Sequence, residues 1–379
     1  MLFKADAETA HNLSITALKF APIPTLCSKS DVLAQNFAGL RFANPVGLAP
    51  GYDKNAEVPV EILRLGFGFT EVGTLTPLPQ EGNPKPRLFR LVEDKAVINR
   101  MGFNNAGQDA AIARLRNIPD DALTGPLGIN IGANKDSADR IADYVIGVRN
   151  MEPLADYLTV NISSPNTPGL RALQDKAALD DLLAQVMAAR TQGTPVFLKV
   201  APDLQPADID DIVTVAMSRG IAALIISNTT IARPALASCY AGEAGGLSGA
   251  PLRDMAQQRL VDFRKASGGQ IGLIGVGGIA SAQDCCVTRR SLLGRLARQL
   301  PAGELVFTPE ALSAHAGDKW FASHLPEAVA LPGSVESVSR ILAFASKHQI
   351  PVTPRGAGHG YVGGCVPVHG GIVLSVAGM

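Results

Sequence analysis

The feature that most constrains the fold is a regular alternation of short apolar runs with longer segments of helical periodicity. Between the runs, Leu, Ile and Val recur at helical spacing, as in 176–191 and 206–219. Pro206, just ahead of Asp208, is typical of a helix start. Such alternation predicts a parallel sheet, either doubly wound or closed into an eight-fold barrel. The seven runs, each bounded by Gly or Pro, are NPVGLA (44–49), FGFTEVG (67–73), GPLGINIG (125–132), YLTVNIS (157–163), PVFLKVA (195–201), AALIISN (222–228) and IGLIGVGG (271–278).

Polar residues at the carboxyl ends of these runs distinguish the two architectures. A barrel gathers all its strand ends around one mouth, whereas a doubly wound sheet concentrates ligand groups at one switch point. We therefore predict an α/β fold, a (β/α)8 TIM-type barrel. An eighth strand is expected soon after residue 281, and no run there matches it. The polar residues are Lys54, Thr74, Asn130, Asn161, Lys199, Asn228 and the glycines of 275–278.

Charge and composition exclude several classes of protein. Lys plus Arg and Asp plus Glu both number 34, so no basic surface predicts nucleic acid as a partner. A hydrophobic content of 46% is ample for a core and argues against disorder. No apolar run approaches the ~20 residues that span a bilayer, and Asp6 and Glu8 interrupt the start where a signal peptide would be apolar. The five cysteines form no CxxC motif, which favours a reducing compartment, and no metal site is predicted.

Histidine and tryptophan are distributed unevenly along the chain. Of six histidines only His11 precedes residue 287, and the single tryptophan, Trp320, also lies beyond that point. Two pieces of different origin, joined near residue 287, would produce this distribution.

The polar clusters suggest a flat, negatively charged ligand. The segments 99–105 and 161–167 are rich in amides, which both donate and accept hydrogen bonds; the alternative is that Asn, Ser and Pro form turns there. Lys199 lies in an otherwise apolar strand, where an unpaired ammonium is costly, so it favours a ligand with negative charge over a snorkelling lysine. The backbone of 275–278 offers NH groups to a phosphate, as many tight turns do.

Residues 1 to about 284 resemble the quinone-linked, class 2 dihydroorotate dehydrogenases. The resemblance implies an FMN-containing barrel that oxidises dihydroorotate to orotate in pyrimidine synthesis and passes the electrons to a quinone. The matching stretches, in the family's order and spacing, are ADAETAH, NPVGLAPGYDKN, EVGTLTPLPQEGNPKPRLFRL, NRMGFNNAG, NIGANK, VNISSPNTPGLR, FLKVAPD, ISNTT, GGLSGAPL and IGVGGI.

The resemblance also implies roles for individual residues. Ser164 occupies the position of the catalytic base, which relays the C5 proton of dihydroorotate while flavin N5 accepts hydride from C6; a cysteine there would indicate the soluble class. A hydroxyl is a weak base, so its site has to activate it, and the alternative is a plain turn serine. Lys199 would favour negative charge at the N1/O2 edge of reduced flavin. The positions implied to bind substrate are Lys54, Asn99, Arg100, Met101, Gly102, Phe103, Asn104, Asn161, Asn166, Asn228 and Thr229. The positions implied to contact FMN are Pro50, Gly51, Tyr52, Asp53, Lys54, Thr74, Asn130, Asn161, Lys199, Ser227, Gly249 and Gly278.

The segment 5–24 resembles the family's N-terminal helical extension. Its apolar residues Leu13, Ile15, Leu18 and Phe20 fit a helix on a membrane surface and a core-packing helix equally well. The resemblance implies that the extension lies on a membrane and forms the quinone tunnel. The chain is then expected to be peripheral, at the cytoplasmic face of the cell membrane.

The family pattern breaks after SAQD (281–284), where a helix, the eighth strand and a phosphate-binding loop are expected. FMN would keep only the 275–278 half of its phosphate site. Residues 329–375 instead resemble the beginning of an FAD-linked oxidase domain of the glycolate oxidase and D-lactate dehydrogenase (PCMH) type, with a strand, a helix (335–348) and a glycine-rich loop; a surface turn is the alternative. This resemblance stops at Met379, short of a full FAD domain. The positions implied to contact FAD are Arg355, Gly356, Gly358, His359, Gly360, Gly363 and Gly364.

The sequence thus predicts three parts: the extension (1–29), a barrel lacking its last β/α unit (30–285), and an α+β FAD-binding-domain fragment (286–379). Oxidation of dihydroorotate with FMN and a quinone is the expected function. We hypothesise that AVALP (328–332) pairs across the barrel gap to preserve activity. The alternatives are a fragment of an FAD-linked 2-hydroxyacid oxidase, for which no hydroxyacid-binding half is present, and a non-catalytic fusion or truncation product.

Overall fold

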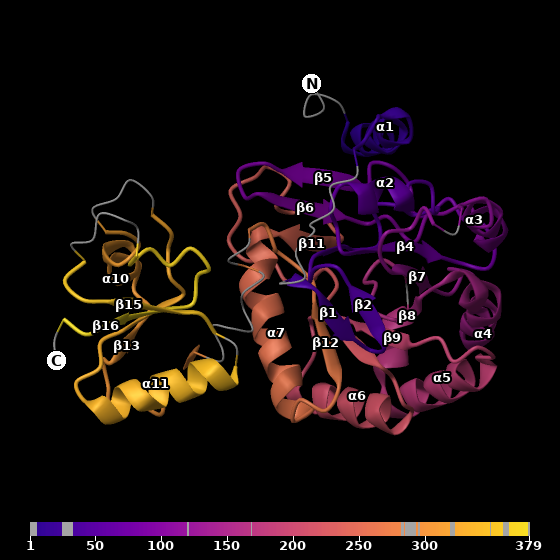
Figure 1. Cartoon of the computed structure of the whole chain (residues 1–379). Helices are drawn as coiled ribbons and strands as arrows, with labels where there is room; N and C mark the ends of the chain where they lie inside the picture. Colours follow the sequence, from indigo (N-terminus) through magenta and orange to yellow (C-terminus); the bar gives the residue numbers. More distant parts are fainter. Residues whose placement is uncertain are drawn as a thin grey trace. The chain divides into compact units, whose positions relative to one another are not determined.

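The computed structural model describes residues 6–24, 33–119, 121–167, 169–281, 284, 293–294, 296–318, 323–348, 350–358 and 364–377. The chain divides into two compact units, Met1–Ala280 and Ser281–Met379, which are described separately (Figure 1). The helices of the first unit are α1 (Ala7–Phe20), α2 (Pro59–Arg64), α3 (Gln108–Leu115), α4 (Arg140–Met151), α5 (Lys176–Ala189), α6 (Pro206–Ser218) and α7 (Arg253–Ala266), with 3₁₀ turns η3 (Glu152–Leu154), η4 (Leu170–Gln174) and η5 (Ala250–Leu252). Its strands are β1 (Gln35–Phe37), β2 (Leu40–Phe42), β3 (Gly47–Leu48), β4 (Phe69–Leu75), β5 (Leu88–Leu91), β6 (Ala96–Asn99), β7 (Leu127–Ile131), β8 (Tyr157–Asn161), β9 (Val196–Val200), β10 (Ala223–Ile226), β11 (Gly246–Gly249) and β12 (Gly272–Gly275).

A seven-stranded parallel sheet forms the frame of the first unit. Its strand order is β12-β10-β9-β8-β7-β4-β3, and every neighbouring pair is parallel. These strands coincide with the seven apolar runs of the sequence, so the predicted barrel strands are confirmed. Within the described part of the chain, no further strand joins β12 to β3, and the sheet therefore stays open where an eighth strand is expected.

The helices cover the outer face of this sheet. In Figure 1, α4 to α7 follow one another around the periphery of the first unit, with the strands inside. The predicted helices over 176–191 and 206–219 are α5 and α6; Leu179, Leu182 and Val186 of α5 are fully buried in the main hydrophobic core. As predicted, α6 begins at Pro206, and the Asp208 carboxylate accepts a hydrogen bond from the Gln205 NH (2.8 Å).

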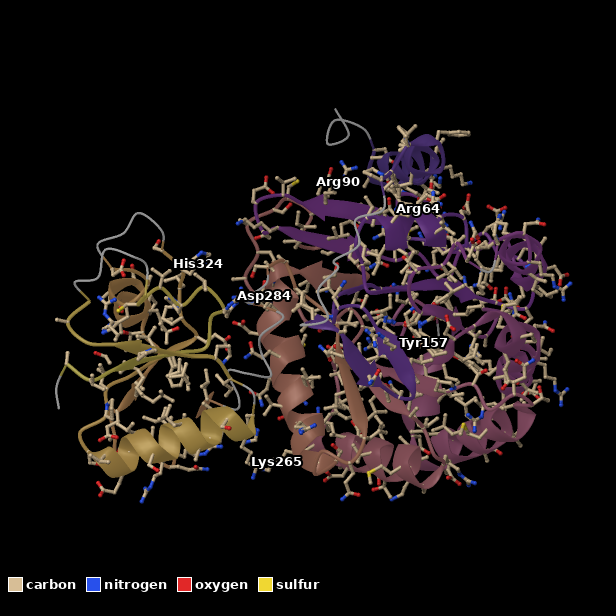
Figure 2. The ribbon with its side chains drawn as sticks, viewed as in Figure 1. Arg64, Arg90, Tyr157, Lys265, Asp284 and His324 are labelled. Carbon is tan, nitrogen blue, oxygen red and sulfur yellow. The ribbon has the colours of Figure 1, made fainter. Side chains whose placement is uncertain are left out.

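The inner face of the sheet is apolar at the amino ends of its strands and polar at their carboxyl ends. At the amino ends of the strands, the Tyr157 and Phe197 rings stack with centroids 4.5 Å apart, and Phe37 of the β1–β2 hairpin meets Phe197 edge-on at 6.0 Å. Figure 2 labels Tyr157, which is fully buried inside the first unit. Further along β8, Thr159 and Asn161 point to the same face because side chains alternate along a strand. Polar groups therefore collect at the carboxyl ends, as predicted.

Two smaller structures lie at the carboxyl-end side of the sheet. β11, β6 and β5 form an antiparallel three-stranded sheet, and α1 lies beside β5 and α2 in Figure 1. Asp6 caps α1 by accepting from the NH groups of Glu8 (3.1 Å) and Thr9 (2.9 Å). Ile15 is buried against Val58, whereas Leu13 and Phe20 of α1 are exposed. No helix within the described ranges is long and apolar enough to cross a membrane.

The second unit has its own sheet and core. Its sheet order is β13-β14-β16-β15, with β13 antiparallel to β14 and the other pairs parallel. The predicted helix over 335–348 is α11, which Ser334 caps and which buries Ile341, Phe344 and Ala345. The elements of this unit are β13 (Leu305–Val306), α10 (Pro309–Ala314), β14 (Ala328–Ala330), α11 (Val335–Lys347), β15 (Val352–Arg355) and β16 (Ile372–Ser375).

The hypothesis that AVALP (328–332) pairs across the barrel gap is wrong. Its strand, β14, is an interior strand of the second unit's sheet, with β13 on one side and β16 on the other. Ala330 lies opposite Leu305 of β13 and Leu374 of β16. Both edges of β14 are therefore occupied, which leaves no free ladder for a strand of the barrel.

Candidate active site

A hydrogen-bonded network links side chains from four strand ends. Thr74 Oγ1 donates to Asn130 Oδ1 (2.6 Å), and Asn161 Nδ2 donates to Thr74 Oγ1 (3.0 Å) and Asn130 Oδ1 (3.1 Å). Ser163 Oγ donates to Asn161 Oδ1 (2.7 Å) and accepts from Asn228 Nδ2 (2.8 Å). Thr74, Asn130 and Asn161 are buried, so their orientations are fixed before any ligand binds. The structure thus brings together four residues that the sequence placed in one site.

A second cluster surrounds the predicted base. Ser164 is buried, and its Oγ accepts a hydrogen bond from the Asn166 NH (3.2 Å). Asn166 Nδ2 donates to the Asn99 carbonyl (3.2 Å), and Asn83 Nδ2 donates to the Asn166 carbonyl (3.3 Å). Through these bonds the loop after β8 lies against the end of β6, and Ser164, Asn166 and Asn99 come together as predicted.

Lys54 and Asn104 line a cavity of about 200 Å³ on the side facing α1. His11 and Tyr52 line it too, with their rings edge-on at 5.2 Å. Burial lowers the pKa of Lys54 to about 8. Burial, assisted by the Lys54 charge, lowers the pKa of His11 to about 4. Asn104 Oδ1 is buried without a hydrogen-bond partner among the described residues, as expected of a group that receives a ligand.

Glycines bring backbone close to the proposed phosphate position. Gly278 has φ +69°, and a Cβ there would lie 2.6 Å from Arg253 Cα, at the first residue of α7. Gly249 has φ +93°, and a Cβ there would lie 2.4 Å from the Lys95 carbonyl oxygen. Both glycines therefore lie near the amino terminus of α7, where backbone NH groups favour an anion. Gly51, at φ +102°, instead faces open space, since a Cβ there would meet no atom within 4 Å.

Comparison with known proteins identifies the family. Residues 32–288 match the dihydroorotate dehydrogenase family. The chain belongs to that family. The dihydroorotate dehydrogenase (quinone) of Novosphingobium aromaticivorans is 66% identical over 288 residues, which cover 75% of this chain and 82% of that protein. Its counterpart from Sphingopyxis alaskensis is 65% identical over 285 residues, covering 75% and 80%.

Solved structures agree with this assignment. The crystal structure of DHODH from Eimeria tenella in complex with ferulenol is 40% identical, with a TM-score of 0.71, and covers 75% of this chain and 83% of that one. The ligand-free form gives a TM-score of 0.72, with 76% and 87% covered. Separately, residues 326–379 match the FAD binding domain family, in line with the resemblance of the tail.

A dihydroorotate dehydrogenase is a flavin oxidoreductase, and the residues of this site fit a flavin. The buried Lys199 offers a donor to an electron-accepting ring with carbonyl edges, and the amides of Asn130 and Asn161 beside it are fixed in orientation. The open space at Gly51 leaves room for ligand atoms.

Several predicted residues have side chains engaged in structural contacts. Arg100 donates to Glu243 (2.7 Å) and to the Pro86 carbonyl (2.9 Å), and its guanidinium lies 4.7 Å from the Phe89 ring centroid. Its backbone is engaged as well, since the NH donates to the Arg87 carbonyl (2.9 Å) and the carbonyl accepts from Asn83 Nδ2 (3.0 Å). Among the other side chains, Asp53 accepts from the Glu57 and Val58 NH groups, Tyr52 bonds Ser14, and Asn228 Oδ1 accepts from the Thr229 NH. Backbone groups are engaged too: the Ser227 NH donates to the Val276 carbonyl, and the carbonyls of Met101, Gly102 and Phe103 accept from Asn83 or Gln80.

Sequence reasoning missed two charged residues of this region. Glu71 is buried inside β4, and its carboxylate accepts from Asn130 Nδ2 (2.7 Å). Arg171 pairs with Asp203 (2.9 Å) and donates to the Ser163 (3.2 Å) and Thr229 (3.3 Å) carbonyls. A signal existed for Glu71, because a charge within an apolar strand is the same cue that singled out Lys199.

The FAD-like loop of the second unit is described only in part. Arg355 ends β15, and its guanidinium donates to the Gly317 carbonyl. At Gly356 and Gly364 a Cβ would meet no atom within 4 Å. Gly358 has φ +70°. The predicted contacts His359, Gly360 and Gly363 lie outside the described residues.

Proposed function

We propose that this chain oxidises dihydroorotate to orotate, with FMN as cofactor and a quinone as electron acceptor, in pyrimidine synthesis. The observation that carries the proposal is the buried network Thr74–Asn130–Asn161, held at the mouth of a barrel with the Ser164 cluster beside it. The relatives from Novosphingobium and Sphingopyxis bear the name dihydroorotate dehydrogenase (quinone), which supports substrate and acceptor alike.

Each cluster has a task in this reaction. When bound, FMN supplies the hydride acceptor. Ser164 relays the C5 proton: its hydroxyl releases its own proton towards solvent as it takes the one from the substrate carbon, and the hydrogen bond from the Asn166 NH stabilises the partial negative charge that this release places on its oxygen. The amides of Asn161 and Asn228 hold ring edges. With its pKa at about 8, Lys54 is mostly protonated at neutral pH and can pair with the substrate carboxylate.

The cavity between α1 and Lys54 is proposed as the route of the quinone. Its volume of about 200 Å³ suits a flat ring, and His11 and Tyr52 present both apolar surface and polar edges to it. α1 leaves Leu13 52% and Phe20 81% exposed, which supports docking on a membrane surface. The described thiols Cys239 and Cys365 are free, in keeping with a position at the cytoplasmic face.

The test is a steady-state assay of the purified chain in detergent micelles. The expected result is orotate formation that requires both dihydroorotate and a soluble quinone analogue, at equal stoichiometry. Protein that binds flavin but forms no orotate would refute the proposal. Lys54→Met should raise the KM for dihydroorotate far more than that for the quinone, because it removes the charge for the carboxylate.

For the second unit, we infer a separate flavin site from the match of residues 326–379 to the FAD binding domain family. The backbone at Gly356, Gly358 and Gly364 would approach the diphosphate, next to Arg355. Mass analysis of released flavin tests this: FAD found alongside FMN supports it, and FMN alone contradicts it. Reduction by glycolate or lactate would favour the hydroxyacid oxidase alternative. Protein without any flavin would favour a non-catalytic product.

A further inference from the structure

Glu71 is a buried carboxylate for which the proposed function has no role. It is 4% exposed and lies in the middle of β4. Its Oε1 accepts from Asn130 Nδ2 (2.7 Å) and its Oε2 from the Tyr157 hydroxyl (3.2 Å). Both oxygens act as acceptors, the pattern of an ionised carboxylate, since a protonated one would have to donate from one oxygen.

Strand register places Glu71 one layer below the flavin-site network. Glu71 lies opposite Gly128 of β7, and Asn130 follows two residues later on the same face. Gly128 is required here because a Cβ would lie 2.1 Å from the Tyr157 ring. The glycine thus leaves room for the Tyr157 hydroxyl to reach the Glu71 carboxylate, and the arrangement is built from three strands.

Lys199 supplies the opposite charge. It lies opposite Asn161 in the β8–β9 ladder, on the face that carries the network, and is 5% exposed. Burial lowers the pKa of Lys199, and the negative charge of Glu71 opposes that shift. Burial likewise raises the pKa of Glu71, opposed by the charge of Lys199 and by its hydrogen bonds. Each group thus opposes the loss of the other's charge in a place where a lone charge would be costly.

We propose that Glu71 is a positioning residue of the flavin site, which balances the charge of Lys199 and holds Asn130 in orientation. The inference rests on the proposed FMN function. Without Glu71, the net charge of the buried network would be one unit more positive. Negative charge at the N1/O2 edge is then stabilised more strongly, so the flavin becomes easier to reduce and binds sulfite at N5 more tightly.

The first experiment measures sulfite binding and the midpoint potential of the FMN-bound protein. Glu71→Gln preserves shape but removes the charge, so sulfite affinity is expected to rise by at least about tenfold and the potential to become more positive. Glu71→Asp keeps the charge but shortens the reach to Asn130, so sulfite affinity stays near that of the wild type while FMN binds more weakly. Glu152→Gln is the matched control, because among the described residues this buried carboxylate accepts only from the 191–194 turn. Unchanged sulfite affinity in Glu71→Gln overturns the proposal.

The second experiment needs no flavin. The opening free energies of β8 amides, from hydrogen exchange in apoprotein, are compared for Glu71→Gln, Lys199→Met and the double variant. If the two charges are coupled, the fold-change in the opening constant of the double variant should be smaller, by at least about tenfold, than the product of the fold-changes of the two single variants. Additive changes overturn the pairing. Failure of the wild type to bind FMN would instead refute the proposed function, and this cycle would still decide whether Glu71 and Lys199 act together.

Discussion

At the residue scale, the site combines polar groups that are fully partnered with groups that await a ligand. Thr74, Asn130 and Asn161 satisfy one another inside the barrel. Asn104 keeps a buried oxygen without a partner among the described residues. Partnered groups are rigid and orient a ligand, whereas an unpartnered one gains a hydrogen bond only on binding. Lys54 and Asn104 are therefore expected to contribute most to the affinity for substrate.

Ser164→Ala tests the proposed base. Loss of the hydroxyl should slow flavin reduction by dihydroorotate about 10²–10⁴-fold, the usual contribution of a positioned base, without changing flavin content. Rapid mixing under anaerobic conditions measures this rate. Ser218→Ala is the control, because that hydroxyl donates only to the Val215 carbonyl at the end of α6. A Ser164→Ala rate within twofold of wild type would exclude Ser164 as the base.

Whether a site residue can be recognised from the sequence depends on where it lies in the chain and what it contacts. Asn161 and Lys199 are recognisable because a polar side chain inside an apolar strand needs a partner, and their neighbours in space follow from parallel strands. Arg171 escaped notice because it lies in the short 3₁₀ turn η4, outside the apolar strands, where an arginine needs no explanation. Only the fold reveals that it reaches Asp203 and two loop carbonyls.

At the element scale, α1 is held to the barrel by a small number of polar contacts. Glu8 is buried between Arg87 (2.7 Å) and Lys85 (3.5 Å), and the Arg87 hydrogen bond lowers the pKa of Glu8. Ser14 bonds the Tyr52 hydroxyl (2.9 Å). The moderate apolar pattern of α1 did not decide between core packing and membrane docking, because Ile15 faces the barrel while Phe20 does not.

The docking of α1 should weaken as pH falls. His11 has a pKa of about 4 in the docked state, below its ordinary 6.5, so the undocked state binds the proton more readily. The stabilisation is complete above pH 6.5 and is lost as pH falls from 6.5 towards 4. Hydrogen exchange of the α1 amides, corrected for intrinsic rates, measures it. His11→Gln should remove the dependence above pH 5; a dependence that persists in this variant would assign it to another group.

Arg171 joins the loops that follow β8, β9 and β10 through its contacts with Ser163, Asp203 and Thr229, and we call this set of contacts the clamp. Arg171→Ala tests its role. Releasing the loop that carries Ser164 should lower kcat by about 10²-fold, because small misplacements of catalytic groups are costly, while sulfite affinity stays unchanged. Arg219→Ala is the control, since the Arg219–Asp180 pair lies on the surface with 37% and 42% of its side chains exposed. Equal kcat in both variants would show that the clamp does not position Ser164.

At the scale of the whole molecule, each of the two units has its own hydrophobic core. The barrel core gathers around Ile129, Leu158 and Leu198, and that of the second unit around Leu296, Ile341 and Ile372. Calorimetry should therefore resolve two unfolding transitions, and added FMN should raise the midpoint of one of them only. A single transition, shifted as a whole by FMN, would contradict this.

Architecture was predictable at this scale, but the partner of one strand was not. Seven apolar runs with polar ends specify seven parallel strands, since each must be covered by helices on one side. For β14 the same apolar pattern says only that the strand is buried, and nothing in it names the neighbouring strands. The structure shows them to be β13 and β16.

The central claim is that this seven-stranded barrel holds FMN and delivers electrons to it from dihydroorotate. Anaerobic titration of the purified chain with dihydroorotate, followed by release and mass identification of the flavin, tests it most directly. We expect one FMN in the barrel; its yellow absorbance should bleach with one equivalent of dihydroorotate, and one orotate should form. A chain that carries no FMN, or whose FMN stays oxidised, would contradict it.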